Sequence, residues 1–123
     1  TILLREFPYL NDEEYYEIIR LKERFYSENI GQTKLLPFAN EILNKFFELN
    51  TTVLVTNCRE DRAIMTLSQH DLTNKFENKI FRKSIDKDQH VNKFENALKI
   101  LDLEPQMIIA FENEQFEIES GLW

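Results

Sequence analysis

Apolar residues recur every three or four positions in several long segments of the chain, which is the spacing of one face of an α-helix. In the first segment Asn11 is followed three residues later by Glu14, a combination that forms a capping box at a helix start. Pro37 indicates the start of the second, because proline is well tolerated in the first turn of a helix. Residues 1–10 are expected to be extended. The predicted helices cover residues 11–27, 37–47, 61–69 and 91–101, and a further one begins at residues 112–114.

Three short runs of apolar and β-branched residues interrupt the helical pattern and predict β-strands. They lie at residues 52–55, 79–82 and 107–111. An uninterrupted apolar run is typical of a strand that is buried on both faces of a parallel sheet. Since the predicted strands alternate with helices, we expect an α/β fold with a parallel sheet and right-handed crossovers.

The first and third of these strands end in residues suited to binding ions. Thr56 and Asn57 follow the first strand, and Glu112, Asn113 and Glu114 follow the third. In a parallel sheet both ends lie on one edge, where open α/β sheets bind ligands. The Thr56 hydroxyl and the N–H groups at the next helix start suit a phosphate or carboxylate, whereas carboxylates with an amide oxygen suit Mg²⁺. An alternative stays open, because Thr-Asn also caps helices and acidic residues are favoured at helix N-termini.

A pocket that holds both an anion and carboxylates also needs a positive charge. Lys87, in the polar loop 83–89, and Lys93, at the start of the next helix, are the two candidates. Most lysines of an acidic chain are solvated surface residues, so that interpretation also stays open for both. Cys58 lies beside the predicted site without an evident base partner, and we interpret it as a bystander.

Composition excludes several classes of function. The chain has 123 residues, which suits one domain with a modest core, and a net charge of −7, which disfavours nucleic-acid binding. No apolar run approaches the roughly 20 residues that span a bilayer, so we expect no membrane partner. The single cysteine fits a reducing compartment, and we expect a cytoplasmic protein.

Four segments, taken in order, carry a resemblance to a known family. They are LLPFANEIL at 35–43, VLVTN at 53–57, LDLEP at 101–105 and IIAFENE at 108–114. With these segments the chain resembles the haloacid-dehalogenase-like (HAD) superfamily, whose members are mostly phosphohydrolases. The resemblance covers most of the chain.

The resemblance implies a three-layer, Rossmann-like parallel sheet flanked by helices, incomplete in this chain. Residues 35–123 would form the HAD-like α/β core, truncated at its C-terminal end. Residues 1–34 would form an N-terminal helical segment, either a cap or the remnant of one.

It also implies a Mg²⁺-dependent phosphatase that acts on a small phosphorylated metabolite. Thr56 and the backbone of Asn57 would hold the phosphoryl oxygens, Lys93 or Lys87 would offset negative charge, and Glu112 with Asn113 would hold Mg²⁺. Asn113 departs from the family pattern, which often has an aspartate at that place. The nucleophilic aspartate of the family motif Asp-x-Asp-x-Thr is not in these residues, and Thr1 is a candidate for its last position.

In this family the first strand lies between the strand that ends at Thr56 and the strand that ends at Phe111. Without it both neighbours would have unpaired inner edges, which are costly and promote association. We therefore expect a segment of the parent protein, or a second copy in a homo-oligomer, to fill this gap. The alternative function is a catalytically inactive HAD-fold module for binding or scaffolding. Its partner surface would be formed by the aromatic residues Tyr9, Tyr15, Tyr16 and Phe25. The sequence leaves the substrate open.

Overall fold

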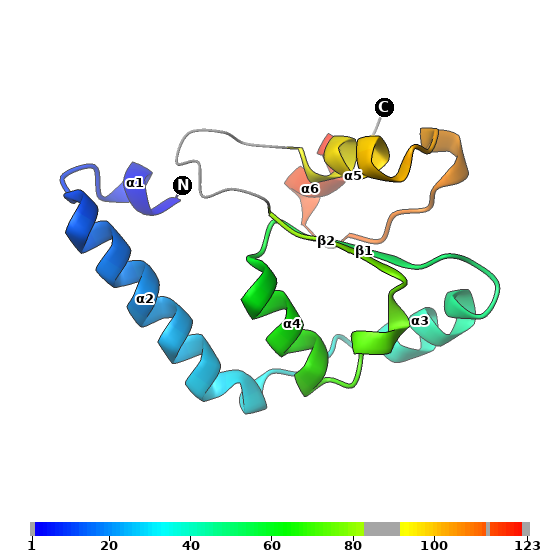
Figure 1. Ribbon diagram of the computed structural model, residues 1–123, viewed down its shortest axis with the longest axis horizontal. Coiled ribbons are helices and arrows are strands. Elements are labelled where there is room, and N and C mark those ends of the chain that lie inside the picture. The colour runs from blue at the N-terminus through cyan, green and yellow to red at the C-terminus, as the bar shows by residue number, and fades with distance from the viewer. Residues whose placement is uncertain (1, 83–91, 113, 122–123) are drawn as a thin grey trace.

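The computed structural model describes residues 2–82, 92–112 and 114–121, and shows a mixed α/β arrangement (Figure 1). The predicted loop 83–89 lies outside the described residues, as does Thr1. Short 3₁₀ turns at Ile30–Gln32, Thr73–Lys75 and Pro105–Met107 connect some of the main elements. The helices and strands are α1 (Ile2–Glu6), α2 (Asp12–Asn29), α3 (Ala39–Phe47), β1 (Val53–Val55), α4 (Glu60–Gln69), β2 (Asn78–Ile80), α5 (Lys93–Leu101) and α6 (Gln115–Ser120).

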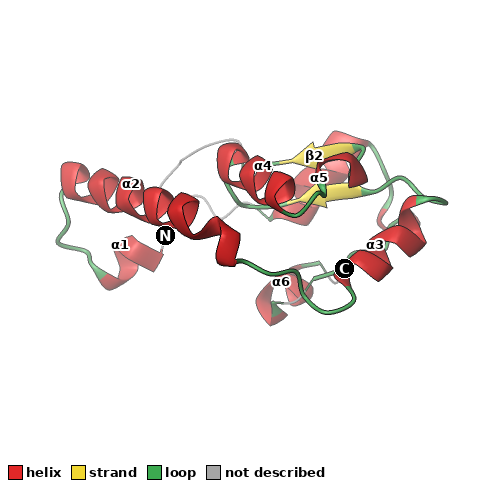
Figure 2. Ribbon diagram, turned by 90° about the horizontal axis from the view of Figure 1, so that it is seen from below, coloured by secondary structure: helices red, strands yellow, loops and turns green. Residues whose placement is uncertain are grey.

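The two strands form a parallel pair, as the alternation of strands and helices predicts. Val53 lies opposite Asn78, and Val55 lies opposite Ile80. Helix α4 connects the strands, and α4 and α5 lie on opposite sides of them (Figures 1 and 2). Helix α5 packs against β1. The coarse prediction of an α/β fold with parallel strands is therefore confirmed.

Helix α2 begins where the sequence predicts, and the capping box is formed in both directions. The side-chain oxygen of Asn11 accepts the N–H of Glu14 at 2.9 Å, and the Glu14 carboxylate accepts the N–H of Asn11 at 3.0 Å. Further along, α2 packs against α4, where the Tyr26 and Thr66 hydroxyls lie 2.8 Å apart. The helical content of residues 1–34 is thus provided by α1, α2 and the first 3₁₀ turn.

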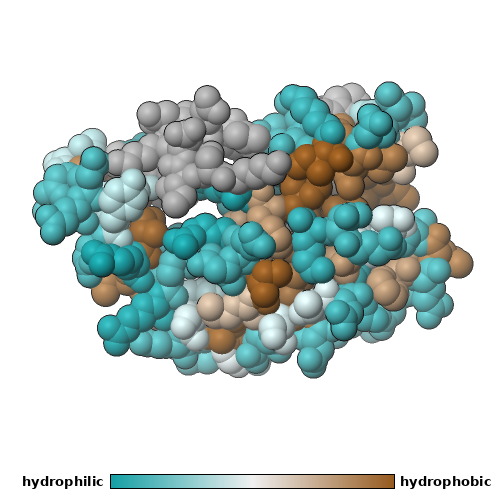
Figure 3. All heavy atoms as spheres, in the orientation of Figure 1, coloured by the Kyte–Doolittle hydropathy of each residue, from teal (hydrophilic) through white to brown (hydrophobic). Residues whose placement is uncertain are grey.

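The core is small and lies around α4 and the strand pair. One face of α4 is buried through Ala63 and Leu67, which are four residues apart. Large apolar residues remain exposed elsewhere, and Figure 3 shows apolar surface between α5 and the strands. The most buried apolar residues are Tyr15, Ala63, Leu67, Leu72, Ile80 and Ala97.

Two predictions about chain segments are wrong. Residues 2–6 are helical rather than extended, because leucine, arginine and glutamate favour helix and Phe7 N–H donates to the Leu3 carbonyl at 2.9 Å. Residues 107–111 do not form the predicted third strand. Pro105 starts a 3₁₀ turn there, in which Ile108 N–H donates to the Pro105 carbonyl at 3.1 Å.

The absence of the third strand has a physical reason. A strand is stabilised by hydrogen bonds to a neighbouring strand, and apolar sequence alone does not supply them. Within the described part of the chain β1 pairs only with β2. The apolar segment is correspondingly exposed, with Ile109 at 75% and Phe111 at 62%, although the Phe111 ring lies 5.4 Å from that of Phe46.

Candidate functional site

The residues that follow β1 form a tight turn held by the side chain of Thr56. The Thr56 N–H donates to the Ile80 carbonyl at 3.0 Å, which extends the strand pairing by one residue. Its hydroxyl oxygen accepts the N–H of Cys58 at 3.0 Å, so threonine organises the turn before α4. Asn57 is exposed at the tip. The Thr56 hydroxyl accepts this bond and keeps its own proton to donate, which suits an anion.

Cys58 lies beside this turn and has the properties of an unreactive thiol. It is half-buried, and its carbonyl accepts the N–H of Arg82 at 3.2 Å. Burial raises the pKa of the Cys58 thiol above its ordinary value, and the nearby charge of Arg62 opposes this only in part. A nucleophilic cysteine needs a lowered pKa, so the chemistry of Cys58 does not suit that role.

Lys93 and Glu112, two of the residues singled out in the sequence, meet in the structure. The Lys93 ammonium forms an ion pair with Oε2 of Glu112, and their side chains are only 12% and 15% exposed. The other carboxylate oxygen of Glu112 accepts the N–H of Glu114 at 3.3 Å. Residues 19 positions apart in sequence therefore place a positive and a negative charge together, largely shielded from water.

The local sequence explains where Lys93 stands. Asn92 caps α5, its side-chain oxygen accepting the N–H groups of Phe94 at 3.0 Å and Glu95 at 3.3 Å. Lys93 is consequently the first residue of the helix. A cation is disfavoured at a helix N-terminus by the macrodipole, and the carboxylate of Glu112 offsets this.

The strand tips and the start of α5 lie toward the same end of the molecule. In Figure 1 both strands run toward the end where α4 begins, and α5 also starts on that side. Parallel strands with a following helix give this arrangement, and it is the edge where α/β proteins bind ligands.

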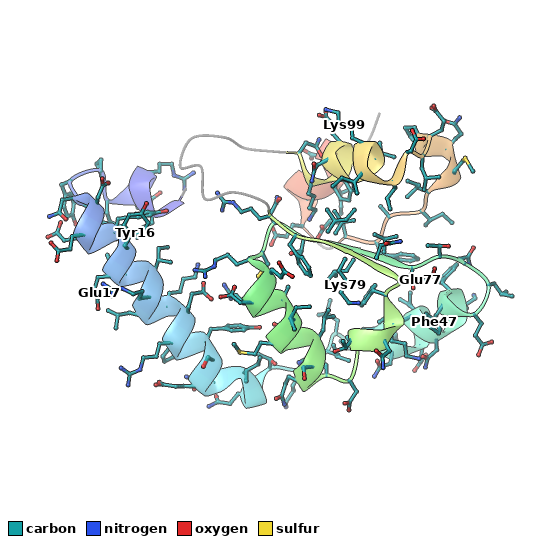
Figure 4. All side chains as sticks on the ribbon, viewed as in Figure 1. Tyr16, Glu17, Phe47, Glu77, Lys79 and Lys99 are labelled. Carbon is teal, nitrogen blue, oxygen red and sulfur yellow. The ribbon has the colours of Figure 1, made fainter. Side chains whose placement is uncertain are left out.

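A cavity of about 370 Å³ lies along β2 next to this edge. Lys79 contributes to its lining, lies on the α4 side of the strands (Figure 4), and donates to the Phe76 carbonyl at 2.9 Å. The apolar pattern of residues 79–82 predicts only a strand, although two cations, Lys79 and Arg82, lie close together in an acidic chain. The lining residues are Glu60, Lys79, Ile80, Phe81, Arg82 and Ile100.

Two of the predicted site residues, Lys87 and Asn113, lie outside the described residues. Among those that the structure describes, no group of three or more His, Cys, Asp or Glu side chains is placed to hold a metal ion. Mg²⁺, however, is usually held by one or two carboxylates, substrate phosphates and water rather than by a complete protein cage. Glu112 offers the hard oxygen donor that this cation takes, so its chemistry fits one ligand position.

Comparison with known proteins adds no relative. No protein-family model, curated protein or solved structure matches this chain. Of the helices in the described ranges, none combines the length and apolar character needed to cross a membrane.

Proposed function

We propose that this chain belongs to a HAD-type phosphohydrolase that acts on a small phosphorylated metabolite. The observation that carries the proposal is the pairing of Lys93 with Glu112 at the start of α5. The resemblance requires a lysine and an acidic residue to share a pocket at the carboxyl edge of a parallel sheet. The pair supports such a shared pocket, because lysine and glutamate are seldom shielded from water unless they are paired.

The pairing also favours Lys93 over Lys87 as the charge-offsetting lysine. Lys93 is held by the first turn of α5 and by Glu112, and its Nζ lies 5.2 Å from the Phe94 ring centroid. In the proposed reaction its ammonium stabilises negative charge on the phosphoryl group. Such preorganised charge is a main contribution to phosphoryl transfer.

Thr56 and Asn57 would bind the substrate phosphate. The Thr56 hydroxyl donates to one phosphoryl oxygen while the Cys58 N–H keeps that side chain oriented. The Asn57 backbone N–H supplies a second donor. An aspartate outside this chain would attack phosphorus to form an aspartyl-phosphate, which water then hydrolyses.

Mg²⁺ is the proposed cofactor, with Glu112 and Asn113 as its ligands from this chain. When bound it supplies positive charge for the phosphoryl oxygens. The contribution of this chain is to hold the Glu112 carboxylate at the site through Lys93 and Glu114 N–H.

The complete three-layer sheet is part of the same proposal. A further strand would pair with the edge of β1 that has no strand neighbour among the described residues, and it would give residues 108–111 a neighbour. This would cover the exposed side chains of Ile109 and Phe111. The strand would come from the segment that carries the nucleophilic aspartate.

Hydrolysis of p-nitrophenyl phosphate by the full-length protein, with and without Mg²⁺, tests the proposal. We expect Thr56→Ala and Lys93→Met each to lower kcat/KM by about 100-fold, as loss of one preorganised transition-state contact does. The matched controls are the exposed residues Thr73→Ala and Lys99→Met, which should leave turnover unchanged. Turnover by Thr56→Ala and Lys93→Met equal to that of the controls would contradict the proposed roles.

The alternative of a non-catalytic binding module has a distinct outcome in the same experiment. Of the four aromatic residues expected to form its partner surface, Tyr15 is only 2% exposed, so its inclusion is wrong. Tyr9, at 76%, and Phe25, at 68%, are exposed and favour a partner surface on the α1–α2 segment. A full-length protein that binds inorganic phosphate but never releases p-nitrophenol under any metal condition would support this alternative.

A further inference from the structure

The cavity of about 370 Å³ beside β2 lies on the outer edge of that strand, away from β1. Its lining includes the consecutive residues 79–82, and consecutive side chains of a strand point to alternate faces. It also includes Glu60 of α4 and Ile100 of α5, two helices that lie on opposite sides of the strands (Figures 1 and 2). A cavity that both sides reach lies on an edge of the strand pair, and β1 occupies the inner edge of β2.

Two hydrogen bonds fix the direction of the backbone at Phe81. The Ile80 carbonyl accepts the Thr56 N–H at 3.0 Å, so this carbonyl points toward β1. The Arg82 N–H donates to the Cys58 carbonyl at 3.2 Å and points the same way. The carbonyl and N–H of a trans peptide point in opposite directions, so the N–H and the carbonyl of Phe81 both point away from β1. Among the described residues neither of these two groups has a backbone hydrogen-bond partner.

Lys79 places a positive charge along the same edge. Its ammonium donates to the Phe76 carbonyl at 2.9 Å. That carbonyl also points away from β1, because the Glu77 N–H of the same peptide donates to the Thr52 carbonyl at 2.9 Å. Lys79 forms no ion pair with a carboxylate of the described residues. An ammonium has three N–H donors, so Lys79 can bind a carboxylate while it keeps this bond.

We propose that the outer edge of β2 binds an extended, acidic peptide segment of a partner protein, which joins the sheet as a further strand. The Phe81 N–H donates to a carbonyl of the peptide, and the Phe81 carbonyl accepts a peptide N–H. Lys79 pairs with an acidic side chain, and Ile80 and Ile100 supply apolar lining for a neighbouring one. Main-chain bonds give affinity in strand addition, and side-chain contacts give specificity. The inference is independent of the proposed phosphatase activity.

The charge of this edge favours an acidic segment over a second copy of the chain. Two copies that paired through it would bring Lys79 and Arg82 of one copy beside the same cations of the other. Like charges that face each other across strands are destabilising, and lysine on an edge strand commonly prevents such pairing. A carboxylate in the incoming strand replaces this repulsion by attraction.

Fluorescence anisotropy of a labelled peptide, titrated with the full-length protein, tests the proposal. The probe is the end-blocked peptide Ser-Thr-Val-Glu-Val-Thr-Ser, and its control has lysine in place of the glutamate. We expect the lysine peptide to bind about 10-fold more weakly than the glutamate peptide. No binding of the glutamate peptide, or equal affinity of the two peptides, would overturn the proposal.

Substitution of Phe81 tests the main-chain contact. Phe81→Pro removes the outward N–H and leaves both bonds toward β1 in place, as proline does on an edge strand. The matched control Phe81→Ala loses the same ring and keeps the N–H. We expect Phe81→Pro to bind the glutamate peptide about 10-fold more weakly than Phe81→Ala. Equal affinities of these two variants would refute strand addition.

If Phe81→Pro does not fold, as judged by circular dichroism, Lys79 and amide exchange decide. Lys79→Met should bind the glutamate peptide about five-fold more weakly than the wild type. Lys99→Met, at an exposed position of α5, should bind it unchanged. In the wild type the peptide should protect the Phe81 amide from hydrogen exchange, and an unprotected amide would contradict the proposal. A wild-type dimer that the peptide dissociates would assign the edge to a second copy, and displacement of the peptide by an equal concentration of free glutamate would assign the cavity to a small anion; either result would overturn the proposal.

Discussion

The ion pair of Lys93 and Glu112 should contribute much more to stability than an exposed pair of the same chain. Removing one partner of a buried ion pair costs about 3–5 kcal/mol, since the remaining charge loses that partner. Both side chains keep some contact with water, at 12% and 15% exposed. We therefore predict that Lys93→Met and Glu112→Leu each lower the free energy of unfolding by about 2–3 kcal/mol.

The double variant should be destabilised much less than the sum of the two single variants. Replacing both charges by apolar side chains leaves no unpaired charge, which is often close to neutral in stability. We predict an interaction energy of about 2 kcal/mol in the double-mutant cycle.

Urea unfolding of the full-length protein, followed by far-UV circular dichroism, measures the four free energies. The internal comparison is the cycle of Arg24 and Glu28, whose ion pair spans 2.8 Å but is 75% and 55% exposed. An exposed pair of this type contributes about 0.3–0.5 kcal/mol. An interaction energy of Lys93 with Glu112 no larger than that of Arg24 with Glu28 would refute the reasoning from burial.

Three further predictions concern the fold and the thiol. Asn11→Ala removes one half of the capping box and should lower the free energy of unfolding by about 1 kcal/mol in urea titration. Leu67→Ala, at a position 5% exposed, should lower the free energy of unfolding by about 2–4 kcal/mol. Met65→Ala, at a position 37% exposed, should lower it clearly less, and equal values would contradict the placement of the buried face of α4. Burial raises the pKa of Cys58 in the folded state above its ordinary value of 9.0. The stability that the neutral thiol contributes is therefore fully present below pH 9.0, and it is lost as the pH rises through the raised pKa of the folded state. Cys58→Ser should remove this alkaline decline in a series of urea titrations, and an unchanged decline would show that another group causes it.

The sequence predicts the local elements best where several signals agree. At α2 the helical spacing and the Asn11–Glu14 capping box point to the same start, and the structure has both hydrogen bonds. At β1 a β-branched run between polar segments predicts the strand, and its parallel neighbour follows from the intervening helix. These signals are local, so they predict the element correctly even when the rest of the fold is not known.

The third strand shows where such reasoning ends. Residues 108–111 have strong β propensity, yet strand formation depends on a neighbour that sequence pattern does not identify. Residues 2–6 were expected to be extended but form a helix. Their apolar character is compatible with a strand or a helix, and the bond from Phe7 N–H to the Leu3 carbonyl stabilises the helix.

The sequence suggests which residues form the candidate site, but it does not predict which of them contact one another. Thr56 and Glu112 were identified from the ends of predicted strands, and Lys93 from the need for a positive charge. The ion pair itself depends on how α5 packs against β1, which is a long-range property. The local alternative was that Thr56 and Asn57 cap the next helix. The structure instead has Arg59 at the N-cap of α4 without a side-chain cap bond, and the Thr56 hydroxyl accepts the Cys58 N–H in the preceding turn.

The central claim is that Thr56 and Lys93 act on one phosphate at the carboxyl edge of the parallel strands. A crystal structure of the full-length protein with bound phosphate and Mg²⁺ tests this most directly. The account predicts that one phosphate contacts both the Thr56 hydroxyl and the Lys93 ammonium, with Glu112 among the ligands of the cation. A phosphate bound away from Thr56 and Lys93, or a cation bound away from Glu112, would contradict it.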